Sequence, residues 1–80
     1  MIITKADEGR YFTNRGGRIG VIEFVAREDS TLDPVVVYLF ADGTSEHETI
    51  CLTSTGRLFK DQESQSSYDI IRILTNPTNQ

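Results

Sequence analysis

Residues 33–40 read DPVVVYLF, the one run of this chain that is apolar on both alternating faces. In an extended strand Val35, Val37 and Leu39 point to one side, and the other side is formed by Val36, Tyr38 and Phe40. The run is too short to cross a membrane, and its β-branched and aromatic residues favour a strand over a buried helix. We therefore expect residues 33–40 to form the central strand of the fold, covered on both sides.

The strand that precedes this run belongs to a hairpin. The sequence predicts a short strand over residues 10–13, a tight turn over residues 14–17 built on Asn and a Gly pair, and a long strand over residues 18–26. Regular alternation would place Ile22 and Phe24 on one face of the long strand, and Val21 and Glu23 on the other. Because neither face is then purely apolar, we expect the strand to change partners along its length and to bend at Gly20.

The segments after the central run are also short strands and turns. Asp42-Gly43 is a strong hairpin signal, and it is followed by a predicted strand over residues 46–53 with Ile50 and Leu52 facing the core. Further strands are expected over residues 57–60 and residues 68–74, separated by an exposed polar segment, and residues 1–8 are expected to form a frayed or edge strand. The polar segment 27–33 is interpreted as a mobile loop or a single helical turn.

Five or six short antiparallel strands with glycine turns between them predict an all-β fold. An SH3-like barrel suits strands that are joined by tight hairpins. The alternative is an OB-like barrel, which usually includes a helix, and only residues 27–33 are available for one. We expect residues 1–74 to form one small barrel domain and residues 75–80, which contain no apolar side chain, to be a disordered tail.

The charge and the cysteine content of the chain limit its possible binding partners and its cellular location. Twelve acidic and eight basic residues give a net charge of -4, which disfavours indiscriminate binding to nucleic acid through counterion release. The arginines are dispersed among the acids, so the chain is not a DNA mimic. The only cysteine, Cys51, cannot form an internal disulfide, and no apolar leader precedes the domain, so a cytoplasmic location is expected.

No constellation of residues predicts catalysis or metal binding. His47 and Cys51 lie roughly 13 Å apart on one strand, too far for a nucleophile and its base, and they are too few for a zinc site. The acidic pairs lack the spacing of a calcium loop. The glycine-rich segment 9–18 lacks the lysine and the following helix of a phosphate-binding loop. We therefore expect no enzymatic activity, no metal and no cofactor.

The binding candidates are basic and aromatic residues. Arg15 or Arg18, with backbone amides at a barrel rim, would suit an anionic ligand. Aromatic side chains line the shallow grooves in which small barrels bind peptides or stack bases, and tyrosine tolerates an interface best. The predicted binding residues are Arg10, Tyr11, Arg15, Arg18, Tyr38, Arg57 and Tyr68.

Three segments carry a resemblance to a known group of proteins. They read GRYFTNRGGR at residues 9–18, STGRLF at residues 54–59 and ESQSSYDII at residues 63–71. Across residues 9–74 the chain resembles short uncharacterised proteins of tailed phages and prophages, although Asn14 and one residue within 63–69 are insertions relative to that pattern. The resemblance implies a phage accessory protein that acts in the cytoplasm of a bacterial host. Residues 15–22 also resemble the KOW motif, whose RNA-binding versions are less acidic than this chain.

Two hypotheses about function follow. The first is a non-enzymatic protein-binding module that modulates or inhibits a host or defence complex. The second is a small barrel that binds a nucleotide or nucleic acid through Arg10, Arg15, Arg18 and Tyr11. A protein partner is favoured over nucleic acid, and no membrane is expected. A second copy of the chain is a further candidate partner, because the flat edge of a small barrel can accept a strand.

Overall fold

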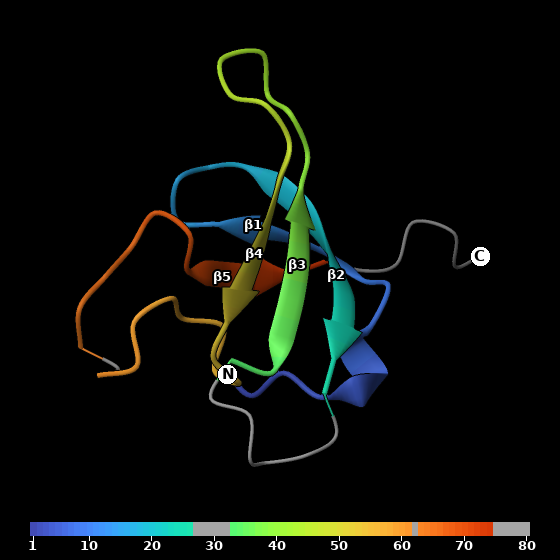
Figure 1. Cartoon of the computed structure of the whole chain (residues 1–80), viewed down its shortest axis with the longest axis vertical. Coiled ribbons are helices and arrows are strands. Elements are labelled where there is room, and N and C mark those ends of the chain that lie inside the picture. Colours follow the sequence, from blue (N-terminus) through green and yellow to red (C-terminus); the bar gives the residue numbers. More distant parts are fainter. Residues whose placement is uncertain (27–32, 62, 75–80) are drawn as a thin grey trace.

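The computed structural model describes residues 1–26, 33–61 and 63–74, and they form one antiparallel sheet of five strands in the order β4-β3-β2-β1-β5 (Figure 1). The strands are β1 Tyr11–Asn14, β2 Ile19–Val25, β3 Val35–Leu39, β4 Glu48–Leu52 and β5 Ile70–Ile73, and a 3-10 turn, η1 Lys5–Asp7, precedes them. Strands β1 to β4 are neighbours in chain order, and β5 returns beside β1. The prediction of a small all-β fold of five antiparallel strands is confirmed, and it is consistent with a small barrel-like fold. Within the described ranges no helix is long and apolar enough to cross a membrane.

The first hairpin forms as the sequence indicates. Gly17 has a φ of +89°, and its N–H donates to the Asn14 carbonyl at 2.9 Å. The Asn14 side chain is buried, and its Oδ1 accepts from the Arg18 N–H at 2.9 Å, so one asparagine closes the turn with both its backbone and its amide. This turn fixes the register that pairs Phe12 with Gly20.

A β-bulge in β2 overturns the predicted faces of that strand. Gly20 to Ile22 pair in regular order with β3, but the register then shifts so that Phe24 lies opposite Val36 and Glu23 is the extra residue. Ile22 and Val25 are consequently buried, while Phe24 is exposed. The prediction that Ile22 and Phe24 share a face was therefore wrong, and the irregularity lies at Glu23 rather than at Gly20.

Gly20 has a different role, which is to allow close approach. A Cβ at this position would lie 2.4 Å from the Tyr38 carbonyl oxygen and 2.8 Å from the Phe12 ring. Only glycine leaves room for the Phe12 ring to pack directly on the backbone of β2.

The core lies on one side of the sheet. Its buried apolar members are Ile3, Phe12, Ile22, Val25, Val35, Val37, Leu39, Leu52 and Ile70. The inward residues of β3 are fully buried, but Val36, Tyr38 and Phe40 on its other face are only half-buried. The expectation that this strand is covered on both sides was therefore wrong for its second face. β3 does have a strand on each side, β4 and β2.

Two predicted strands are absent from the described part of the chain. Residues 1–8 contain η1 instead, and Ile3 enters the core while its N–H donates to the Ser54 carbonyl at 2.8 Å. Residues 57–60 form bends and a turn, because the chain reverses after β4: the Thr53 N–H donates to the Arg57 carbonyl, and the Gly56 carbonyl accepts from Ile70. This turn joins the end of β4 to the start of β5. The predictions for residues 27–32 and 75–80 fall outside the described residues.

Candidate binding surface

The face of the sheet opposite the core carries a continuous row of side chains from four strands. Tyr38 of β3 pairs with Thr49 of β4 on one side and with Val21 of β2 on the other, and Val21 pairs with Tyr11 of β1. Residues paired across an antiparallel sheet project from the same face, so these four side chains lie in one line across it. The bulge at Glu23 adds Phe24 to this face, opposite Val36. We call it the outer face.

Aromatic rings form the centre of the outer face. Phe40 lies edge-to-face with Tyr11 at 5.7 Å between ring centroids and with Tyr38 at 5.5 Å, and His47 stacks on Tyr38 at 5.5 Å. Tyr11 and Tyr38 are separated by β2, so the Phe40 ring bridges over that strand. The two pairs that Phe40 makes contribute about 0.5–1.5 kcal/mol each beyond their buried area. The rings of Tyr11, Tyr38 and Phe40 nevertheless stay only half-buried.

Exposed apolar side chains flank the aromatic row. Phe24 and Ile19 are 49% and 46% exposed, respectively, and Val21 and Val36 are half-buried. The Lys5 Nζ lies 4.3 Å from the centre of the Phe24 ring, so a cation already packs on one aromatic ring of this face. The outer face therefore combines apolar area with ring faces that attract positive charge.

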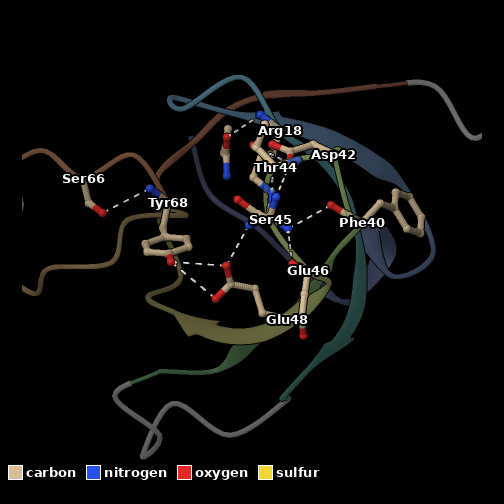
Figure 2. Close-up of polar contacts among 10 residues, drawn as sticks. Arg18, Phe40, Asp42, Thr44, Ser45, Glu46, Glu48, Ser66 and Tyr68 are labelled. Carbon is tan, nitrogen blue, oxygen red and sulfur yellow. Dashed lines mark hydrogen bonds and ion pairs between the residues drawn. The ribbon is translucent and has the colours of Figure 1, made fainter.

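Arg18 fixes the loop from which Phe40 and His47 project. The loop between β3 and β4 extends beyond the sheet (Figure 1). The Arg18 guanidinium contacts both ends of this loop. Its Nη1 donates to Glu48 Oε2 at 2.7 Å, and its Nη2 donates to the carbonyls of Phe40 at 2.9 Å and Glu46 at 2.8 Å. Figure 2 shows the Phe40 carbonyl turned toward Arg18 and its ring turned away. Arg18 is only 11% exposed, so it acts as an internal clamp.

Two further sets of hydrogen bonds hold the residues around Arg18 in place. The Tyr68 hydroxyl donates to the Glu48 carboxylate at 3.3 Å, which connects the segment before β5 to β4 (Figure 2). At the loop tip Asp42 Oδ1 accepts from the N–H groups of Thr44 and Ser45, and these hydrogen bonds, the one from Thr44 foremost, lower the pKa of Asp42.

Arg15 is paired with a buried carboxylate. Asp69 is 1% exposed, and its Oδ2 accepts from Arg15 Nη2 at 3.2 Å and from the Ser66 N–H at 3.0 Å, while its Oδ1 accepts from the Leu58 N–H at 3.0 Å. Burial alone raises the pKa of Asp69, but the hydrogen bonds from Leu58, Ser66 and Arg15 outweigh it and lower the pKa. As an ionised side chain, Asp69 therefore joins the turn between β1 and β2 to two points of the connection between β4 and β5.

Of the seven predicted binding residues, two lie on the outer face and five make contacts within the chain. Tyr11 and Tyr38 lie together on the outer face. Arg15, Arg18 and Tyr68 make the internal contacts described above. Arg10 pairs with Asp7 and donates to the Leu74 carbonyl, both at 3.2 Å, and Arg57 donates to the Ser64 carbonyl at 3.5 Å.

Sequence reasoning missed His47 and Phe24 as parts of the surface. His47 could be found only from its stacking on Tyr38, and Phe24 was assigned to the wrong face by regular alternation. Within the described residues no group of three or more His, Cys, Asp or Glu side chains is placed to hold a metal ion.

No family model, no curated protein and no solved structure matches the chain in comparisons with known proteins.

Proposed function

We propose that this protein is a non-enzymatic protein-binding module that docks its partner on the outer face. The observation that supports this is the aromatic row Tyr11–Phe40–Tyr38–His47, flanked by exposed Phe24 and Ile19 on the same face. Small monomeric proteins rarely leave a contiguous apolar area exposed unless it is an interaction site. Tyrosine and phenylalanine are also enriched at the cores of protein interfaces.

The state of the basic residues favours a protein partner over nucleic acid. Of the arginines put forward for an anionic ligand, Arg10, Arg15 and Arg18 each have a carboxylate partner within the chain. A guanidinium in an ion pair must break that pair, or share it, before it contacts a phosphate. A nucleic-acid surface needs basic side chains whose charge is free to replace counterions.

The resemblance of residues 9–74 to phage and prophage proteins supports a bacterial setting for this module. In this proposal it is an accessory protein in the host cytoplasm, where it modulates or inhibits a host or defence complex.

The test is affinity capture from bacterial lysate with three forms of the protein. Phe24→Asp places a charge on the outer face, and Phe59→Asp is the matched control, because Phe59 is similarly exposed at 44% but lies outside the strands. A partner retained by the wild type and by Phe59→Asp, and lost by Phe24→Asp, supports the proposal. Capture of nothing, or equal capture by all three forms, refutes it.

A further inference from the structure

The backbone of β4 presents unpaired groups at one edge of the sheet. The Phe40 N–H donates to the Ile19 carbonyl and the Ala26 N–H donates to the Pro34 carbonyl, so even-numbered residues of β3 bond to β2. The odd-numbered ones, Val35, Val37 and Leu39, therefore bond to β4, where they pair with Leu52, Ile50 and Glu48. Alternation leaves the N–H and C=O groups of Thr49 and Cys51 directed away from the sheet.

These outward groups end where the neighbouring turn begins. The next outward N–H, that of Thr53, donates to the Arg57 carbonyl at 2.9 Å. Among the described segments, none makes a backbone hydrogen bond to Thr49 or Cys51 from that side. Both side chains are exposed. As far as residues 1–26, 33–61 and 63–74 are concerned, the edge is thus unpaired over the length of β4 and closed beyond it.

The two edges of the sheet differ in how they resist further pairing. Proteins protect edge strands with bulges, charged side chains or proline. β5 is four residues long, its pairing with β1 is interrupted by a bulge at Ile71, and it carries exposed Arg72. β4 is longer, pairs in unbroken register, and has no lysine, arginine or proline between Glu48 and Leu52. β4 is therefore the edge suited to accept a strand.

We propose that β4 binds an extended, basic segment of the partner protein by strand addition. Such a strand would exchange main-chain hydrogen bonds with Thr49 and Cys51, and its alternate side chains would lie beside theirs on the outer face, next to Tyr38 and Val36. The inference rests on the proposed function and specifies how the partner is held: by the edge of β4 together with the outer face.

The contact area of the β4 edge and the negative charge of the chain both favour a basic segment of a partner protein at this edge. A symmetric pairing of two five-residue edges is by itself a small contact beside the roughly 1,200 Å² or more that a stable dimer buries, so we propose a partner that covers the outer face as well as the edge. The chain has a net charge of -4. Exposed Glu46, two residues before β4, has no ion pair with a described residue. Lysine or arginine in the added strand would complement Glu46 and the net negative charge of the chain.

The experiment selects binders from a displayed library of random dodecapeptides and measures their affinity for three forms of the protein. Cys51→Pro removes the outward N–H of β4 while leaving its ladder with β3, because proline is tolerated where an edge strand faces solvent. Cys51→Ala is the matched control, since it removes the thiol and keeps the N–H. Phe24→Asp tests the outer face separately.

We expect the selected peptides to be rich in lysine and arginine with alternating apolar residues. They should bind the wild type and Cys51→Ala equally, and Cys51→Pro at least tenfold more weakly. A second measurement does not depend on the folding of the proline variant. Two versions of a selected peptide are made, with backbone N-methyl groups on either its odd-numbered or its even-numbered residues. The version that methylates the N–H groups facing β4 should lose binding to the wild type, and the other version should bind unchanged.

The other outcomes separate the two proposals. One outcome is that Phe24→Asp loses binding, while Cys51→Pro and both N-methylated peptides bind as before. This outcome overturns strand addition and keeps the outer face as a docking surface. Binding that is unchanged in both variants overturns both. Recovery of no peptide, or of acidic peptides, overturns the basic-strand inference. A dimer in sedimentation analysis that Cys51→Pro dissociates assigns the edge to a second copy and overturns it as well.

Discussion

Asp69→Asn should destabilise the fold more than any other change of a single carboxylate to an amide among the described residues. Asp69 is buried and accepts hydrogen bonds from Leu58, Ser66 and Arg15. The amide nitrogen of asparagine can only donate, so in either orientation at least one partly buried N–H group, that of Leu58 or Ser66, loses its acceptor. That loss costs about 1–3 kcal/mol, and the weaker bond to Arg15 adds about 1 kcal/mol.

The assay is urea unfolding at pH 7, with a loss of about 2–4 kcal/mol expected for Asp69→Asn. In a domain of this size each kcal/mol shifts the thermal midpoint by roughly 4–8 °C, so a fall of about 8–32 °C should accompany it. Asp61→Asn is the control. Asp61 Oδ1 also accepts N–H groups from Glu63 and Ser64, but it is exposed, and water can replace it as the acceptor. Its midpoint should stay close to that of the wild type.

The same pair of proteins tests the ionisation of Asp69. Because its pKa in the folded protein is lowered below the ordinary value of 3.8, its contribution to stability is complete above that value. The contribution is then lost as the pH falls through the folded pKa. The difference between wild type and Asp69→Asn should therefore be constant from pH 5 to pH 7 and shrink below about pH 3.8. A difference under 1 kcal/mol at pH 7, or one that grows in acid, would refute this reasoning.

Other substitutions test the close approach in β2 and the clamp under the loop. Gly20→Ala should cost about 2–3 kcal/mol in urea unfolding, because its Cβ would lie 2.4 Å from a backbone oxygen of β3. Gly43→Ala meets no atom within 4 Å and should cost only about 1–2 kcal/mol, for its positive φ. Arg18→Met should cost about 2–3 kcal/mol, since two carbonyls and Glu48 lose a charged donor. Tyr68→Phe should cost under about 1 kcal/mol, because its contacts to Glu48 are long, at 3.3 and 3.4 Å. Equal losses for Arg18→Met and Tyr68→Phe would contradict the clamp.

The strands were predictable where hydrophobic alternation and turn chemistry act locally. Some elements depend only on residues within their own segment, and these form where the sequence predicts them. They are the turns at residues 14–17 and 42–43 and the strand with alternating faces within residues 35–40. The bulge was not predictable, because one extra residue at Glu23 inverts the faces of Phe24 and Val25 without changing the composition of the strand. Leu58 and Phe59 were interpreted as a strand on the same local grounds, but the reversal at Thr53–Arg57 depends on hydrogen bonds to the Arg57 and Gly56 carbonyls.

The candidate surface was half predictable for a similar reason. Tyr11 and Tyr38 were selected as aromatics, and they do lie together, but the sequence does not show that Phe40 would bridge them across β2. The arginines were selected for their charge. Their partners are distant in the sequence: Arg15 bonds to Asp69, and Arg18 bonds to Glu48. No spacing rule connects such pairs, so a side chain that looks like a ligand contact proves to be an internal one.

The energies of the outer face explain why the edge of β4 matters to binding. Completing the burial of a half-exposed apolar side chain yields about 1 kcal/mol, so the five or six side chains of this face supply roughly 5–6 kcal/mol. Loss of translational and rotational freedom on association costs at least about 4 kcal/mol, so the face alone gives only weak binding. Main-chain hydrogen bonds at Thr49 and Cys51 add contacts that cost little side-chain entropy. Loss of the outward N–H in Cys51→Pro should therefore weaken binding of a selected peptide more than Tyr38→Leu does. Titration of both variants with one peptide measures the order, and the reverse order would show that the rings dominate.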